Sequence, residues 1–429
     1  MGHNHKLFEG RWAWLKLLLL ALVPLALIGL GGWVAGWQIW AQRHRSLAEQ
    51  ALARRDLTGA LEHLKLCLRV WPTSSETHFL AARTARRAGL YDEAEEHLRL
   101  CKKYDGVPEA IELEQALVAT QRGDWKYEQY LHGCVAADHP DAELILEALV
   151  FSYMKTYRLG HAIKCLDYWL EHFPDNVLAR LWRGRARELT RFFAEALEDY
   201  HRAVELAPDH FEARERLAEL LIHKHQAAEA LPHFEYLRQR QPDNAAVLLG
   251  LARCRAELAE HEAARELLDQ FLATHPDHPV ALTERGKLAL AMGQPAEAEP
   301  WLRRAAVASY DPETIYVLMR CLHQNGKAGE AKEWLARFQQ VEADLKRVVK
   351  ATRAITQRPN DPDLRCEVGT LMLRNGQEEE GLRWLNSALH EKPEHGPTLQ
   401  ALADYYGRHG RPDVAAGFRA RARRAGLAP

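Results

Sequence analysis

The sequence contains none of the short motifs that carry most enzymatic and metal chemistry. It has no Gly-rich phosphate loop, no GxSxG, no HExxH and no paired CxxC motif. Its seven cysteines are an odd number, and no two have CxxC spacing, so no disulfide framework is indicated. The 22 histidines do not gather at metal-ligand spacings. We therefore expect no metal, no cofactor and no enzyme, with an active site assembled from distant residues as the alternative.

Charge of one sign and β-branched residues are also scarce. The formal net charge is -2, which gives no electrostatic reason to expect a nucleic-acid partner. Ala, Leu, Arg and Glu dominate, so helix is favoured over strand. A chain of 429 residues is too long for a single small core. Several units or a repeat array are therefore expected.

Charged residues are absent from a run of 25 positions, Leu17 to Ala41. This length suffices to cross a hydrocarbon core of about 30 Å. Aromatic belts are typical of membrane interfaces. The tryptophans at the two ends of the run are Trp12, Trp14, Trp33, Trp37 and Trp40. We predict a short tail over residues 1–16 and a single transmembrane helix over 17–41, with a lipid bilayer as partner. A cleaved signal peptide is the alternative.

The residues flanking this run bear on orientation and assembly. Three cations precede it and four follow it, which does not decide the orientation. Because a short positive tail before a first apolar run usually stays inside, we expect a single-pass protein of the bacterial inner membrane with its large part outside the cytoplasm. Gly32 and Gly36 form a GxxxG pair, a pattern that packs two helices together, so a homodimer is one expectation.

Two hexapeptides, EHLKLC at 62–67 and EHLRLC at 96–101, reveal an internal period of 34 residues. The residue that precedes each by two positions recurs at Ala60, Ala94, Tyr127, Ala162, Ala196, Ala230, Ala264, Ala298, Ala331, Gly381 and Ala415. The steps are 33 to 35 residues, apart from one step of 50. Such a period indicates a solenoid. Cys67 and Cys101 are then small packed residues of successive repeats, too far apart for a disulfide.

Each period has the punctuation of two helices. The turn glycines are Gly89, Gly123, Gly160, Gly293, Gly326, Gly376 and Gly410. A proline then ends most second segments. This pattern resembles the tetratricopeptide repeat family, and the best match is residues 177–210. The matching positions are Gly184, Ala196, Tyr200, Ala203 and Pro208.

The resemblance implies an all-α fold, a right-handed α-solenoid of about eleven repeats after the anchor. Repeats 1–9 are expected over 42–338, an extended helix over 339–358, and repeats 10–11 with a carboxyl-terminal capping helix over 359–429. It also implies a concave groove, lined by the first helix of each repeat, that binds proteins or peptides.

The groove-facing positions carried over from the family form a largely basic stripe. They are Arg185, Glu219, Arg253, Lys287 and Arg320, with Phe151, Trp182 and Tyr316 at other groove-facing positions. A basic stripe with aromatics suits an extended peptide with acidic groups or a free carboxylate. In the alternative interpretation, these cations pair with acids on the same surface, namely Glu188, Glu219, Glu257 and Glu284.

The step of 50 residues adds a segment without Pro or Gly. Its apolar stripe is Val341, Leu345, Val348, Thr352 and Ile355, at spacings of 4, 3, 4 and 3. The segment is either a longer second helix that buries its stripe on a neighbouring repeat or a docking helix for a partner or a second copy.

These features together predict a membrane-anchored scaffold or adaptor that supports assembly of a membrane or envelope complex. A co-chaperone-like binder of unfolded or carboxyl-terminal peptides is the alternative in the same class. Fold alone does not name the pathway.

Overall fold

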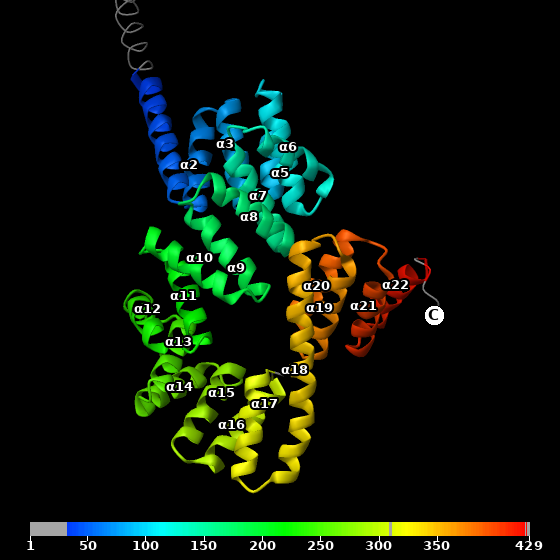
Figure 1. The fold of residues 1–429 in the computed structure, drawn as a ribbon. Helices are drawn as coiled ribbons and strands as arrows, with labels where there is room; N and C mark the ends of the chain where they lie inside the picture. Colours follow the sequence, from blue (N-terminus) through cyan, green and yellow to red (C-terminus); the bar gives the residue numbers. More distant parts are fainter. Residues whose placement is uncertain (1–31, 309–310, 425, 427–429) are drawn as a thin grey trace, which may run out of the picture. The chain divides into compact units, whose positions relative to one another are not determined.

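The computed structural model describes residues 32–308, 311–424 and 426, and within these ranges every regular element is a helix (Figure 1). The chain divides into two compact units. Unit 1 is Met1–Ala148 and unit 2 is Leu149–Pro429.

Unit 1 begins its described part with helical residues 32–53. Its further elements are α2 (Leu57–Val70), α3 (Ser75–Arg87), α4 (Tyr91–Lys103), α5 (Pro108–Arg122), the 3-10 helix η1 (Trp125–Tyr127), α6 (Glu128–Ala136) and the first part of α7 (Ala142–Lys155). The second helix of the third repeat is thus split into η1 and a short α6, at the position where Tyr127 replaces the usual alanine.

Unit 2 continues from α7. Its helices are α8 (Leu159–His172), α9 (Val177–Leu189), α10 (Phe193–Leu206), α11 (Phe211–His223), α12 (Ala227–Arg240), α13 (Ala245–Glu257), α14 (His261–Thr274), α15 (Pro279–Ala291), α16 (Pro295–Ala308), α17 (Pro312–Gln324), α18 (Ala328–Gln357), α19 (Pro362–Arg374), α20 (Glu378–Glu391), α21 (Gly396–Arg408) and α22 (Pro412–Arg424). Over the described residues the two units form consecutive helix pairs, as an α-solenoid requires.

The backbone shows the repeat period directly. The turn between the two helices of each pair has one residue with positive φ: Arg55, Gly89, Gly123, Tyr157, Arg191, His225, Ala259, Gly293, Gly326, Gly376 and Gly410. Six of these are the glycines expected at the turns, and glycine adopts this conformation without steric cost. Gly160 was a wrong assignment, because Tyr157 (φ 57°) makes that turn and Gly160 lies inside α8.

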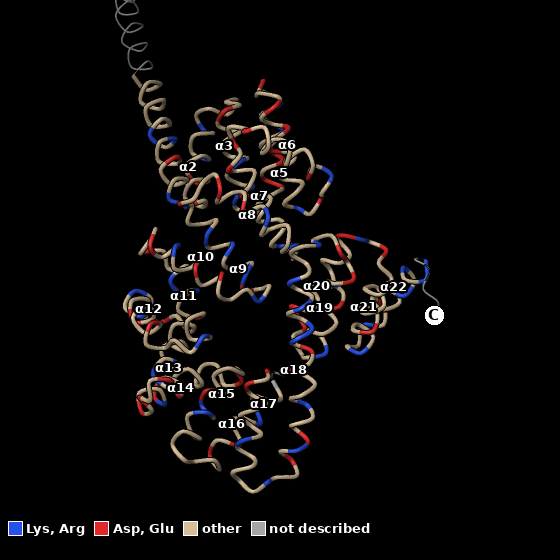
Figure 2. The backbone as a smooth tube through the Cα atoms, viewed as in Figure 1, with Lys and Arg blue, Asp and Glu red and all other residues tan. Residues whose placement is uncertain are grey.

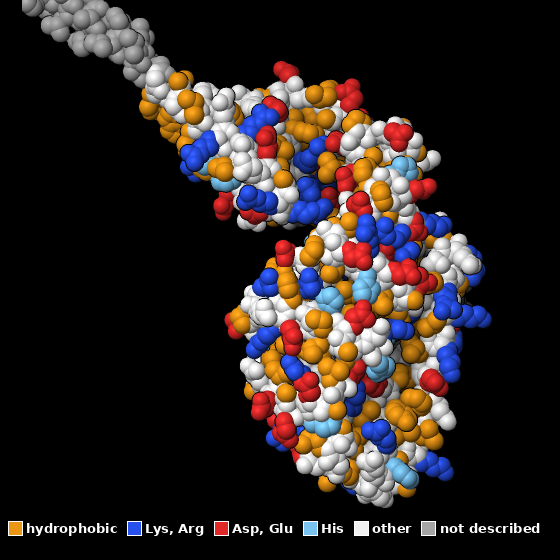
Figure 3. Space-filling view, turned by 60° about the vertical axis from the view of Figure 1, so that its left-hand side comes forward, with side chains coloured by type: hydrophobic (Ala, Val, Ile, Leu, Met, Phe, Trp, Pro, Cys, Tyr) orange, Lys and Arg blue, Asp and Glu red, His pale blue; other side chains and the backbone are white. Residues whose placement is uncertain are grey.

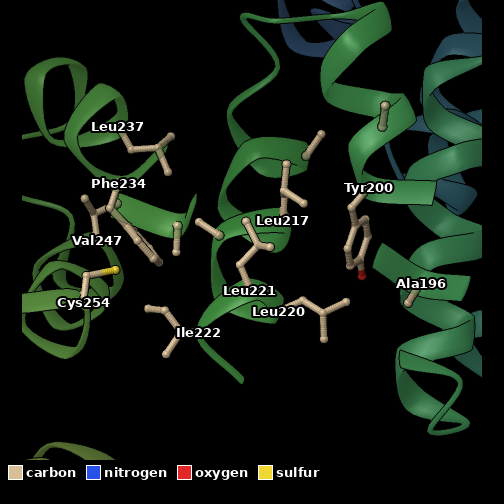
Figure 4. Close-up of a cluster of buried hydrophobic side chains, with 14 of the residues drawn as sticks. Ala196, Tyr200, Leu217, Leu220, Leu221, Ile222, Phe234, Leu237, Val247 and Cys254 are labelled. Atoms are coloured by element: carbon tan, nitrogen blue, oxygen red, sulfur yellow. The ribbon is translucent and has the colours of Figure 1, made fainter. Parts of the chain in front are cut away.

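Adjacent helices approach closely where a small residue faces a large one. A Cβ added to Gly184 would lie 2.5 Å from the Tyr200 ring, and one added to Gly250 would lie 2.2 Å from the Phe234 ring. Tyr200 and Phe234 belong to one buried cluster that runs from α9 through α13 (Figure 4). Each repeat therefore completes the core of its neighbour, as in a solenoid.

The long helix expected after Ala331 is α18, which has 30 residues. The apolar side chains of its stripe are turned into unit 2: Val341, Val348, Thr352 and Ile355 are buried, and Leu345 is half-buried. Val348 and Ile355 pack with Leu159 and Trp384 in one hydrophobic cluster. The stripe is therefore packed within the chain, as in the first interpretation, but it contacts α8 of a distant repeat as well as α20 of the neighbouring one.

This packing joins parts of unit 2 that are far apart in sequence. Helices α9 to α18 run in an arc, and α18 returns to contact α8 (Figure 1). A Cβ added to Gly160 would lie 2.9 Å from the Ile355 carbonyl oxygen, so the two backbones nearly touch. We call this contact of α8 with α18, α19 and α20 the closure.

A buried ion cluster lies at the closure. The Arg158 Nε donates to Glu391 Oε1 at 2.7 Å. The Arg365 Nη2 lies 3.1 Å from the same oxygen, and its Nη1 donates to the Tyr157 carbonyl oxygen at 3.1 Å. Burial lowers the pKa of Arg365 to about 10, although Glu391 opposes this shift. One carboxylate thus serves two buried guanidinium groups.

The two hexapeptides are one structural part used twice. The Nδ1 atoms of His63 and His44 are 3.1 Å apart, and those of His97 and His78 are also 3.1 Å apart. The Cys67 and Cys101 thiols each donate to a backbone oxygen of the preceding helix at 3.3 Å. All seven cysteines are free.

Most of the predicted anchor over 17–41 lies outside the described residues, as do Trp12 and Trp14. Residues 32–41 are helical, with Trp33 and Trp37 exposed and Trp40 partly so. The rings of Trp37 lie 5.7 Å from those of Trp33 and 5.6 Å from those of Trp40, measured between centroids. No described helix is both long enough and apolar enough to cross a membrane.

Candidate functional site

A cavity of about 460 Å³ lies inside the arc of unit 2, and we call it the central cavity. One wall is charged and consists of side chains from α13, α15 and α17. The other wall is apolar and consists of side chains from α18 and α19. Two groups of residues that the sequence places more than 50 positions apart meet here: Arg253 and Lys287 from the predicted groove, and Val341, Leu345 and Val348 from the predicted stripe.

The charged wall is an alternating ion-pair chain. Glu284 is buried and lies between Arg253, at 3.5 Å, and Lys287, at 3.1 Å. Lys287 also pairs with Glu313 at 2.7 Å. Burial acts to lower the pKa of Lys287, but Glu284 and Glu313 raise it above its ordinary value. The interpretation of internal pairing therefore holds for Arg253 and Lys287, which have Glu284 as their shared partner.

Two histidines extend this wall toward the turns. His225 lies 3.4 Å from Glu257, and His225 itself occupies the positive-φ turn position of its repeat. Burial lowers the pKa of His223, and the nearby Arg191 and Arg253 lower it further. At neutral pH this end of the cavity therefore carries a neutral imidazole among cations.

The apolar wall presents Leu345 as its accessible member. Val341 and Val348 are 6% and 2% exposed, whereas Leu345 is half-buried at the cavity surface. Ile222 from α11 and Met372 from α19 complete this wall. A cavity with one charged and one apolar wall suits a segment that carries both kinds of side chain.

The remaining predicted groove residues are not brought into this cavity. Arg185 and Arg320 are exposed, and neither forms an ion pair with a described residue. Glu219 pairs with Arg216 at 3.1 Å, and burial raises its pKa. Phe151 and Tyr316 are exposed, Tyr316 lies 6.0 Å from Phe338 between ring centroids, and Trp182 packs edge-on against the buried Trp169.

A second cavity of about 520 Å³ adjoins the first, since Arg191 lines both. It is lined by the turn residues Arg191 and Phe192, by Phe193, by Lys224 at the end of α11, and by Arg353 of α18. Sequence reasoning did not single out these cations. A signal was present, because Arg191 stands 34 residues from Tyr157 and from His225, at the turn position where other repeats have glycine.

The charge of unit 2 is otherwise well mixed. Figure 2 shows both signs along α18, α19 and α20, and Figure 3 shows acidic and basic side chains interspersed over the visible face of unit 2. Within the described ranges no group of three or more His, Cys, Asp or Glu residues is arranged to hold a metal ion. A further cavity of about 400 Å³ is lined by Glu219 and Arg253 of the predicted groove.

Sequence and structure comparisons identify the repeats. Residues 186–245 and 221–288 match family models described as tetratricopeptide repeat. The search of curated proteins found no match. Among solved structures, a tetratricopeptide repeat protein from Parabacteroides merdae is 15% identical, covering 66% of this chain and 98% of its own, with a TM-score of 0.42.

Two further solved structures are similar at comparable levels. PilW, a type IV pilus biogenesis factor, is 22% identical, covering 46% of this chain and 91% of its own, with a TM-score of 0.38. Human IFIT1 is 17% identical, covering 83% of this chain and 91% of its own, with a TM-score of 0.38. Over its described residues the chain is an all-helical solenoid, and it contains tetratricopeptide repeats.

Proposed function

We propose that the chain is a membrane-anchored scaffold that binds a segment of a partner protein in the central cavity of unit 2. The observation that carries this proposal is the meeting of Arg253 and Lys287 with Leu345 across one cavity. A partner side chain that contacts Leu345 would leave water for an apolar surface, and polar groups of the same segment would face the charged wall.

The proposal of a membrane anchor is supported by the uncharged run from Leu17 to Ala41 and by the exposed Trp33 and Trp37. We place the anchor in a bacterial inner membrane, with the solenoid outside the cytoplasm. Fractionation of cells should recover the chain with the membranes, and Leu20→Arg with Leu25→Arg should release it, because a charge within an apolar run opposes insertion. A reporter fused after Pro429 tests on which side of the membrane the solenoid lies.

The binding proposal is tested by site-specific photocrosslinking in intact cells. A photoreactive phenylalanine analogue replaces Leu345 in the cavity or, as a control, Phe173, which is exposed at the end of α8. We expect a discrete crosslinked partner at position 345 and none, or a different one, at 173. The same products at both positions would contradict binding in the cavity.

The scaffold and co-chaperone versions of this proposal predict different products. A scaffold should crosslink at Leu345 to one or a few membrane proteins in stable complexes. A co-chaperone-like binder should crosslink to many proteins, and addition of unfolded chains should compete with them.

A further inference from the structure

Three cations surround the second cavity of unit 2, and we call them the cation cluster: Arg191, Lys224 and Arg353. They come from three separate elements, namely the α9–α10 turn, the end of α11 and the second half of α18. None of the three forms an ion pair with any residue in the described ranges. Glu195 is the acidic side chain in the lining, so the cavity holds an excess of positive charge.

Two of these cations lie over aromatic rings at the start of α10. The Arg353 guanidinium carbon lies 6.0 Å from the centroid of the Phe192 ring. The Arg191 guanidinium carbon lies 5.8 Å from the centroid of the Phe193 ring. An arginine that lies over an aromatic ring still has N–H donors along the edge of its guanidinium group. Those donors can bind an anion.

The backbone at Arg191 is in the left-handed conformation of the repeat turns. Its φ is 66°, in the left-handed region that side chains other than glycine rarely adopt. Six equivalent turns in other repeats have glycine there, and four have another residue, namely Arg55, Tyr157, His225 and Ala259. A strained non-glycine residue that lines a cavity is a reason to look for a function of its side chain.

The cations of the two cavities differ in whether they already have an acidic partner, and an anion would bind where they do not. In the central cavity, Arg253 and Lys287 are already paired with Glu284 and Glu313. Burial raises the pKa of Glu380, and the charge of Arg191 partly lowers it again. Among the cations that line the two cavities, those without an ion-pair partner in the described ranges are therefore the three of the cluster, and Arg191 lines both cavities.

We propose that the cation cluster binds an anionic side chain, carboxylate or phosphoryl, of the same partner segment whose apolar side chain lies against Leu345. This inference rests on the proposed function and names the chemistry of the partner: an extended peptide with an acidic or phosphorylated residue near a bulky apolar one. A nucleic acid fits less well, because Glu257 and Glu313 in the adjoining cavity would repel a continuous row of phosphates.

The test uses the purified 429-residue chain and fluorescein-labelled nonapeptides of Gly and Ser. Each peptide carries one Leu and, one to three positions away, Glu, phosphoserine, Gln or Lys. We expect peptides with Glu or phosphoserine to bind at least tenfold more tightly than those with Gln or Lys, with an affinity that falls as salt is added. The ratio of the Glu and phosphoserine affinities identifies which anion the site takes.

Arg191→Gly is the informative variant, because glycine suits the left-handed turn and the fold should not be lost. We expect it to remove most of the preference for an anion, while its thermal midpoint stays at or above that of the parent chain. Ala259→Gly, at the equivalent turn two repeats later, is the matched control and should bind as the parent does. Lys224→Gln and Arg353→Gln should each weaken anion binding severalfold.

The outcomes separate this inference from the proposed function. Equal binding of the Glu and Gln peptides, unchanged in Arg191→Gly, would overturn the cation cluster and leave the central cavity as the binding site. If no peptide binds, the anion site at the cation cluster is also overturned. The proposed function is decided separately, by crosslinking at Leu345. Tighter binding of a single-stranded RNA 12-mer, lost in Arg191→Gly, would overturn the assignment to a peptide.

Discussion

The Arg158 guanidinium donates to the Glu391 carboxylate at 2.7 Å, although 233 residues separate them in the sequence. Both side chains are less than a tenth exposed, and the fully buried Arg365 shares the same carboxylate. Replacing Glu391 by Gln should lower the free energy of unfolding of unit 2 by about 3–5 kcal/mol, because two buried cations lose their counter-ion.

Urea denaturation followed by circular dichroism measures this loss. The control is Glu379→Gln on the same helix, since Glu379 is exposed and pairs with Arg383 four residues away. It should change the free energy of unfolding by less than about 0.5 kcal/mol. Equal effects of the two substitutions would show that the buried ion cluster does not hold the closure.

Two glycines should respond in opposite directions to the same substitution. Gly293 has a φ of 75°, whereas Gly329 lies in the first turn of α18. A Cβ added at either position would meet no atom within 4 Å. Gly293→Ala should destabilise by about 1 kcal/mol, since an L residue strains the left-handed turn. Gly329→Ala should stabilise by about 0.5 kcal/mol through helix propensity. Denaturant midpoints measure both, and shifts of the same sign would contradict the turn assignment.

The His78–His97 pair should make unit 1 sensitive to acid. His78 Nε2 donates to the Pro72 carbonyl oxygen, so His97 Nδ1 donates to His78 Nδ1 when both rings are neutral. Burial lowers the pKa of His97, and the charges of His78 and Lys65 lower it further, whereas Glu93 and Glu96 raise it. The Tyr104 ring stacks on His78. Because the folded pKa lies below the unfolded one, the pair's contribution is present above about pH 6.5 and is lost as the pH falls below it.

Thermal midpoints at pH 7.5 and 5.5 test this dependence. We expect His97→Gln to show a smaller drop between the two pH values than the parent chain. His172→Gln, which alters an exposed imidazole at the end of α8, should retain the full drop. An unchanged drop in His97→Gln would assign the acid sensitivity to other groups.

Two residues of the α18 stripe should differ in role. Ile355 is fully buried in the closure cluster, so Ile355→Ala should cost about 2–5 kcal/mol in unfolding free energy. Leu345 is half-buried at the central cavity, so Leu345→Ala should cost less than about 1.5 kcal/mol and yet reduce partner crosslinking through a neighbouring photoprobe. If Leu345→Ala lowers the free energy of unfolding but leaves partner crosslinking unchanged, Leu345 acts only in core packing.

The sequence was sufficient for the local features of this fold. Small residues such as Ala60 and Ala196 recur at a regular spacing because each repeat packs on the next, and that packing is buried. The turn at Gly123 was also readable, since glycine marks a left-handed residue.

The closure and the ion pairs could not be read in the same way. A repeat period describes neighbours, whereas Arg158 and Glu391 come from repeats six apart, and nothing in the spacing of either residue indicates the other. Gly160 was taken for a turn residue for the same reason, because its small size serves a distant backbone at Ile355. The register placed Arg253 and Lys287 on the inner face with Glu284 as a possible partner, but the pairing of Lys287 with Glu313 depends on how α17 packs against α15.

The contact between α8 and α18 has a consequence for how unit 2 comes apart. In an open repeat array each module touches only its neighbours, so the array can fray from either end. Here a protease cut at the exposed turn around Ala259 would leave two fragments that still share the closure cluster and the Arg158–Glu391 pair. The modules between α8 and α18 should therefore unfold together and refold slowly, since their last contact must join residues about 200 positions apart.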